Sequence, residues 1–203
     1  MTWRTGSPAP GERGSAVTAA VSVIAALCIV AAVIFAFYYF MTPPPTTAGQ
    51  IVSLDVFPIH NVSGGGIIAG GVNGQPETFD EVIVLANVKL KNLTKAPEHV
   101  FDLDSYLYVP GGTIYENGPA GQKNFERAFM AYSQMVPKKG PELRRDTVIQ
   151  PGQVVSGQLL LHYPITEQQW ESRKGLHIVV SWESQNNLVL KLKGKATSSG
   201  WQH

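Results

Sequence analysis

Two pairs of side chains have the types and spacing to do chemistry. Asp102 and Asp104 lie two residues apart in a stretch with strand-like alternation, which puts both carboxylates on one face, roughly 7 Å apart. Such a pair suits calcium binding or glycoside hydrolysis. His162 and His177 fall on polar-facing positions of two predicted strands that we expect to be neighbours, where they could hold a metal ion together with a carboxylate. Solvated strand surfaces explain all four residues as well.

A glycine-rich stretch contains Gly64, Gly66 and Ala69 with the spacing of a dinucleotide-binding turn. That turn works only where its glycines join a strand to a helix whose N-terminus faces the pyrophosphate. More glycines follow Ala69, and each costs about 1 kcal/mol in a helix. We therefore predict a loop without bound nucleotide, with Ile67 and Ile68 as a short hairpin or contact tip.

Local signatures of other enzymes are missing from the sequence. The histidines show neither H-x-x-x-H nor H-x-H spacing, and no C-x-x-C or G-x-S-x-G motif occurs. We therefore predict no catalytic residue, no metal site and no cofactor.

An uncharged apolar segment occupies residues 15–41. As a helix it reaches roughly 40 Å, enough to cross a hydrocarbon core of about 30 Å. It ends in YYFMTPPP rather than in a small-x-small cleavage site, so we expect an uncleaved transmembrane helix. Arg4 and Arg13 precede it and no positive charge follows until Lys89, so the positive-inside rule places the tail of residues 1–14 in the cytoplasm.

The remaining chain divides into a Pro/Thr-rich linker at 42–50, a folded domain at 51–195 and a flexible tail at 196–203. Beyond the cytoplasmic tail, basic and acidic residues are equal in number, which argues against nucleic acid as a partner. The only cysteine, Cys28, lies in the membrane segment, so the outer domain folds without a disulfide. Extracellular domains of this size in animal proteins usually carry disulfides. Their absence therefore favours the plasma (inner) membrane of a bacterium, with the domain periplasmic or extracellular.

Alternation of apolar and polar residues dominates the outer domain. In EVIVLANVKLK the alternate residues from Val82 to Leu90 face one way, and in VFDLDSYLYV we expect Phe101 and Leu103 to do so. The predicted strands cover residues 50–57, 81–91, 100–109, 153–163, 176–182 and 187–193, with shorter candidates at 113–115 and 146–149. Turns rich in Gly, Pro and Asn separate them, so the pattern predicts a mainly β domain, an immunoglobulin-like antiparallel β-sandwich.

An insert at residues 117–145 is too long for a hairpin turn. Apolar side chains recur in it every three or four residues: Phe125, Phe129, Tyr132 and Val136. They predict an amphipathic helix at 122–135 that ends before Pro137. Its apolar face either closes over the domain core or faces another protein.

Basic residues gather in PKKGPELRRD, at 137–146. They could grip a lipid headgroup, an acidic glycan or an acidic protein surface. A solvated loop that Glu142 and Asp146 partly neutralise is the alternative. The candidate interaction surface comprises Ile67, Ile68, Phe125, Phe129, Met130, Tyr132, Lys138, Lys139, Arg144 and Arg145.

Four segments carry a family resemblance: VKLKNLTKAP, FDLDSYLYVPGGTIY, IQPGQVVSGQLLLHYP and LHIVVSW. Their layout resembles a domain-of-unknown-function family of bacterial immunoglobulin-like domains, found on membrane-anchored, lipid-anchored or secreted envelope proteins. The resemblance implies the fold and the envelope location and transfers no catalytic residue. The chain departs from the family in its long insert after Tyr115, and in a membrane helix where many relatives have a lipid-attached cysteine.

We therefore expect a single-pass membrane protein that displays a non-catalytic binding or assembly module to a partner protein in the envelope. Two other functions stay open. One is an accessory subunit of a membrane complex, with contacts made chiefly by the anchor helix. The other is an envelope metal-dependent or hydrolytic enzyme that uses Asp102, Asp104, His162 or His177.

Overall fold

The computed structural model of the protein describes residues 13–41, 45–63 and 77–203, in two units that divide after Pro44. The first unit contains the helix α1 (Arg13–Met41). Its residues Val21–Phe40 are all exposed, and by length and composition they could cross a membrane. The second unit contains the strands and the insert.

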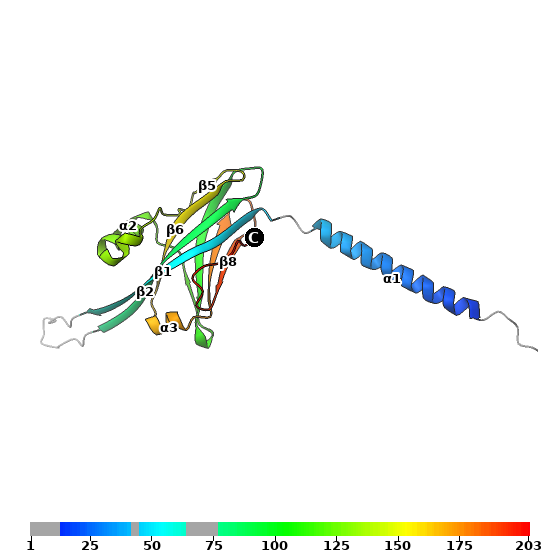
Figure 1. Cartoon of the computed structure of the whole chain (residues 1–203), viewed down its shortest axis with the longest axis horizontal. Coiled ribbons are helices and arrows are strands. Elements are labelled where there is room, and N and C mark those ends of the chain that lie inside the picture. The colour runs from blue at the N-terminus through cyan, green and yellow to red at the C-terminus, as the bar shows by residue number, and fades with distance from the viewer. Residues whose placement is uncertain (1–12, 42–44, 64–76) are drawn as a thin grey trace, which may run out of the picture. The chain divides into compact units, whose positions relative to one another are not determined.

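The strands described in the second unit form two antiparallel sheets (Figure 1). The first sheet has the order β1 (Thr47–Ser63), β2 (Glu77–Asn92), β6 (Val154–Tyr163). The second has the order β4 (Ile114–Asn117), β3 (Glu98–Tyr108), β7 (Gly175–Trp182), β8 (Leu188–Lys193), with β5 (Val148–Ile149) paired to β3. The prediction of a mainly β, antiparallel domain is confirmed. The linker predicted at 42–50 is too long, because β1 already pairs with β2 from Thr47.

Both sheets contribute to one apolar core. The alternate residues of β2 from Val82 to Leu90 are buried in it, as their spacing predicts. A buried tyrosine of β6 connects the sheets, because the Tyr163 hydroxyl donates to Ser105 Oγ of β3 at 2.8 Å. Ser105 in turn donates to the carbonyl of Asn117 at 2.6 Å. The core therefore fixes the point at which the insert leaves β4.

The prediction that Phe101 faces the core is wrong, since its side chain is 69% exposed. The pairing of β3 with β7 contains a bulge between Val100 and Asp102. An extra residue in one strand reverses the alternation beyond it. Val100 and Leu103 consequently occupy the core positions on either side of the bulge.

The insert forms α2 (Gln122–Ala131) and the 3-10 helix η2 (Ser133–Lys138). The helix predicted at 122–135 is thus correct over its first part, whereas Pro137 lies inside η2 instead of after the helix. The insert covers the outer face of the first sheet (Figure 1). A second apolar cluster forms there from Ile59, Ile83, Leu85, Phe125, Phe129, Met135 and Leu160.

The first part of the insert runs along the free edge of β6. The Ala120 amide donates to the Leu160 carbonyl at 2.9 Å, and the Asn117 side-chain amide donates to the His162 carbonyl. These contacts satisfy backbone groups that an edge strand leaves unpaired.

The last part of the insert attaches to Gln158 of β6, whose side chain is buried. The Gln158 amide nitrogen Nε2 donates to the Lys138 carbonyl at 2.9 Å, and its Oε1 accepts the Gly140 amide at 3.0 Å. The Leu143 amide donates to the Gln158 carbonyl at 2.9 Å. Both ends of the insert are therefore fixed to one strand.

The tail predicted to be flexible at 196–203 is instead bound between the two sheets. Gln202 exchanges two backbone hydrogen bonds with Gly49 of β1, at 2.6 and 2.7 Å. Its side-chain amide exchanges two more with the backbone of Lys191 in β8. The expectation failed because it ignored the unpaired edges of β1 and β8, which the tail satisfies.

We predict that Gly157→Ala destabilises the domain by about 2 kcal/mol, because a Cβ there would overpack the insert. That atom would lie 2.6 Å from Cβ and 2.8 Å from Cα of Leu143. The free energy of unfolding, from denaturant titration of the full chain in detergent, measures the loss. Gly140→Ala is the matched control, because its nearest non-neighbouring atom would be 3.7 Å away. Equal stability of the two variants would contradict the packing described.

Candidate ligand-binding site

An open pocket of about 460 Å³ lies between the insert and the outer face of the first sheet. We call it the insert pocket. Its lining residues are Glu81, Ile83, Asn117, Gly118, Pro119, Ala120, Gly121, Asn124, Tyr132, Leu160 and His162. They come from β2, β6, the start of the insert, α2 and the turn after α2.

The Glu81 carboxylate is the centre of the polar groups in the insert pocket. Its Oε1 accepts a hydrogen bond from the Tyr132 hydroxyl at 2.8 Å and another from Asn61 Nδ2 at 3.2 Å. Its Oε2 lies 2.7 Å from His162 Nε2. Three elements therefore hold the carboxylate in one position, with 21% of the side chain exposed.

Tyr132 is held at the end of α2, where its amide donates to the Ala128 carbonyl. The hydrogen bond to Glu81, followed by burial, raises the pKa of the Tyr132 hydroxyl. The phenol therefore stays protonated in neutral solution and remains a donor to the carboxylate.

The remaining lining residues give the insert pocket an apolar floor and an amide rim. Ile83 and Leu160 belong to the second apolar cluster, and Asn117 and Asn124 bring side-chain amides. Among the residues that the structure describes, the lining contains no Ser, Thr or Cys that could act as a nucleophile beside the Glu81–His162 pair. The arrangement is suited to holding a ligand by hydrogen bonds and apolar contact.

The apolar part of the predicted interaction surface is largely buried. Phe125 and Phe129 are 1% and 6% exposed, so the prediction that they offer a contact surface is wrong. Their side chains pack on the sheet because its outer face is itself apolar. Met130 is 77% exposed and stays available to a partner. Ile67 and Ile68, with the rest of the glycine-rich stretch, lie outside the described residues.

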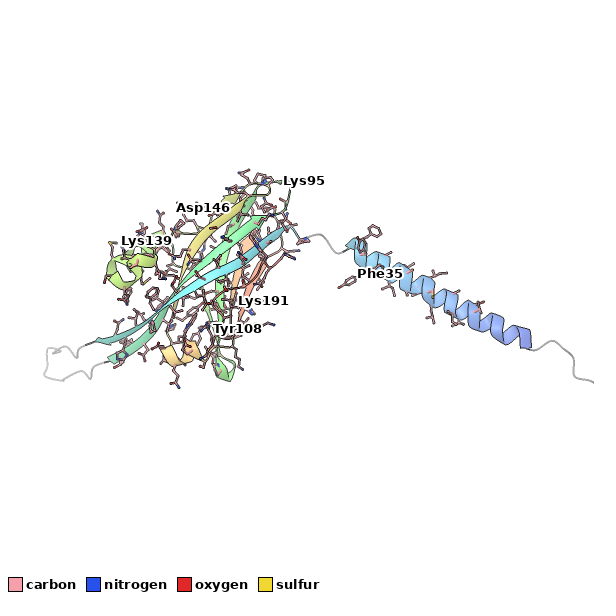
Figure 2. All side chains as sticks on the ribbon, in the orientation of Figure 1. Phe35, Lys95, Tyr108, Lys139, Asp146 and Lys191 are labelled. Atoms are coloured by element: carbon pink, nitrogen blue, oxygen red, sulfur yellow. The ribbon has the colours of Figure 1, made fainter. Side chains whose placement is uncertain are left out.

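The four basic residues of the predicted surface all have carboxylate partners. The ion pairs are Lys138 with Asp55 (3.0 Å), Lys139 with Glu126 (2.6 Å), Arg144 with Asp146 (3.4 Å) and Arg145 with Asp102 (2.8 Å). Figure 2 labels Lys139, on the insert, and Asp146, the residue that follows the insert. Acidic side chains thus compensate the positive charge locally, as the alternative of a neutralised loop requires.

The two pairs considered for chemistry do not assemble into one site. His162 and His177 lie on β6 and β7, which belong to different sheets, so the prediction that these strands are neighbours is wrong. The His177 ring packs against Tyr108 instead, with ring centroids 4.6 Å apart. Asp102 binds Arg145. Among the described residues, no three His, Cys, Asp or Glu side chains are grouped to hold a metal ion.

Sequence reasoning missed Glu81, Asn117 and Asn124. The alternation that buries Val82 to Leu90 puts Glu81 on the opposite, polar face of the strand, yet Ile83 and Leu85 share that face and are buried. Apolar residues on both faces of one strand were the available signal, because they indicate that something covers the outer side. No sequence signal specified that the cover would be residues 117–145.

Comparisons with known proteins do not assign this chain to a family. No family and no curated protein matches it. The Northeast Structural Genomics Consortium target SoR45 is 10% identical, with 70% of this chain and 83% of that chain covered and a TM-score of 0.32. A conserved hypothetical protein from Bacillus anthracis is 13% identical, with 74% and 100% covered and a TM-score of 0.30. At these TM-scores neither structure bears on fold or function.

We predict that Asp104→Asn stabilises the protein at about pH 7 and has little effect near pH 3. Burial, followed by the nearby Asp102 and Glu116 carboxylates, raises the pKa of Asp104. An acid with a raised pKa in the folded state gives stability at low pH that is lost as the pH rises through that pKa. Denaturant midpoints at both pH values measure the difference. Asp146→Asn is the control, because this side chain is 72% exposed and its charge should matter little for stability. Lower stability of the Asp104→Asn protein than of the unaltered protein at neutral pH would contradict the argument.

Proposed function

We propose that this protein is a single-pass membrane protein that displays a non-catalytic immunoglobulin-like binding module on the outer side of a bacterial plasma membrane. The insert pocket is the binding site of this module. The observation that carries the proposal is a fixed carboxylate, Glu81, in an open pocket whose described lining residues include no Ser, Thr or Cys.

The anchor is supported by α1. Its residues Val21–Phe40 expose their side chains along the whole segment, which is unfavourable in water and favourable in a lipid bilayer. The basic residues precede this segment, which favours a cytoplasmic N-terminus. The module would then lie in the periplasm or outside the cell.

The immunoglobulin-like character is supported by the strand arrangement. The sheets β1-β2-β6 and β4-β3-β7-β8 are both antiparallel and share one core. The insert is an addition to this plan, and it builds the pocket on the outer face of the smaller sheet.

A binding role agrees with the way in which charge is distributed around the insert. The basic side chains of residues 138–145 form ion pairs with neighbouring carboxylates. The ionisable residues in the described pocket lining are Glu81, His162 and Tyr132. We expect the ligand to be part of another envelope molecule or to be bound by one.

Cysteine labelling tests the membrane arrangement. In a Cys28→Ser background, we expect Met130→Cys to react with a membrane-impermeant maleimide on intact spheroplasts, because Met130 is 77% exposed on the outer domain. Thr2→Cys is the control and should react only after permeabilisation, since it precedes the anchor. Labelling of position 2 but not of position 130 in intact spheroplasts would contradict the proposed orientation. Release of the protein by a salt or carbonate wash would contradict the anchor.

A further inference from the structure

We propose that the insert pocket recognises a primary ammonium group carried on an aliphatic chain. The inference rests on the proposed function, because it names the chemistry of the ligand that the binding module takes. It draws on the charge of the pocket, the free hydrogen-bond capacity of its polar groups and the nature of its floor.

The charge of the lining favours a cation. Glu81 contributes a carboxylate, and no Lys or Arg belongs to the lining in the part of the chain that the structure describes. The nearest basic residues of the insert, Lys138 and Lys139, form ion pairs with Asp55 and Glu126. His162, 2.7 Å from the carboxylate, is charged only when protonated, so Glu81 is the permanent charge of the described lining. An anionic ligand would meet this carboxylate without a Lys or Arg to compensate it, which is unfavourable in a partly buried site.

The Glu81 carboxylate has capacity for one more strong donor. Each of its oxygens can accept about two hydrogen bonds. Oε1 already accepts two, from Tyr132 and Asn61, whereas Oε2 has, among the described residues, only His162 at hydrogen-bond distance. A ligand donor can occupy the open position on Oε2 without displacing a partner that holds the carboxylate in place.

The amide rim supplies acceptors for the other ammonium hydrogens. Asn117 uses its Nδ2 to donate to the His162 carbonyl, so its Oδ1 remains an acceptor. The Asn124 side chain has no hydrogen-bond partner among the described residues. An ammonium group has three donors and no acceptor, which matches one carboxylate oxygen and two amide oxygens.

The floor of the pocket accommodates the aliphatic part of the ligand. Ile83 and Leu160 are buried in the second apolar cluster and present apolar surface to the pocket. Tyr132, half-buried beside Glu81, adds an aromatic side chain to the lining. A neutral alcohol of the same shape would keep the apolar contacts but lose the charge-assisted hydrogen bond.

Titration of the full chain in detergent tests the inference with n-butylammonium as the probe. Its neutral and anionic counterparts, n-butanol and butyrate, have the same apolar chain. We expect n-butylammonium to bind at least about tenfold more tightly than either, since a hydrogen bond to a charged group is the stronger kind. Equal or tighter binding of n-butanol or butyrate would overturn the inference.

Two variants locate the binding. Glu81→Gln keeps the shape of the side chain and removes its charge, and it should weaken n-butylammonium binding by about tenfold or more. Glu126→Gln removes a carboxylate that lies on the insert outside the pocket lining, and it should leave the affinity unchanged. Unchanged affinity in Glu81→Gln, or an equal loss in Glu126→Gln, would place the binding elsewhere and overturn the inference.

A third variant tests the contact with Glu81 even if the Glu81→Gln protein does not fold. His162→Lys puts a permanent ammonium beside Glu81 from the chain itself, at a side chain 46% exposed. We expect it to fold, as judged by an unchanged denaturant midpoint, and to lose n-butylammonium binding through competition. A folded His162→Lys protein that still binds the probe would contradict the assigned contact.

A comparison of two probes distinguishes the two possible sources of the ammonium group, a lysine side chain of a partner protein and a small free amine. Nα-acetyl-lysine amide represents a lysine of a partner protein, and n-butylammonium represents a small amine. Tighter binding of the first would support a lysine side chain, and equal or weaker binding would support a free amine. If neither probe binds while the labelling of positions 130 and 2 is as expected, the ammonium inference fails and the membrane-anchored module stands.

Discussion

The outer face of the first sheet is apolar, and the insert exists in its observed form because that face has to be covered. Ile83 and Leu85 of β2 and Leu160 of β6 point away from the main core, and all three are buried. Phe125 and Phe129 complete the cover, and each gains about 2 kcal/mol from leaving water. The insert is therefore a structural part of the domain, with a second small core beneath it.

The insert pocket follows from the way in which this cover is attached. β6 is an edge strand, and both ends of the insert bind along it, the start through Ala120 and Asn117 and the end through Gln158. Between these attachments the cover leaves a gap at the base of the long β1–β2 pair, where Glu81 and His162 lie. The side chains proposed to recognise a ligand are thus positioned by the same contacts that close the second core.

The sequence was informative where a short-range pattern had one structural meaning. Alternation from Val82 to Leu90 predicted a buried strand face, and it was correct because both the pattern and the burial have a period of two. The same reasoning failed at Phe101, where a bulge in β3 changed the register with β7. It also missed the attached tail at Gln202 and the position of Glu81 beneath the insert. These depend on which distant segments meet, and alternation carries no information about that.

The most direct test of this account is whether the second core exists in solution. Nuclear Overhauser contacts between the aromatic protons of Phe125 and Phe129 and the methyl groups of Leu85 and Leu160 measure it, in the full chain in detergent. The account predicts these contacts, because the four side chains belong to one buried cluster on the outer face of the first sheet. Their absence, with rings that show the chemical shifts of solvent-exposed phenylalanine, would contradict the covered sheet and the pocket that depends on it.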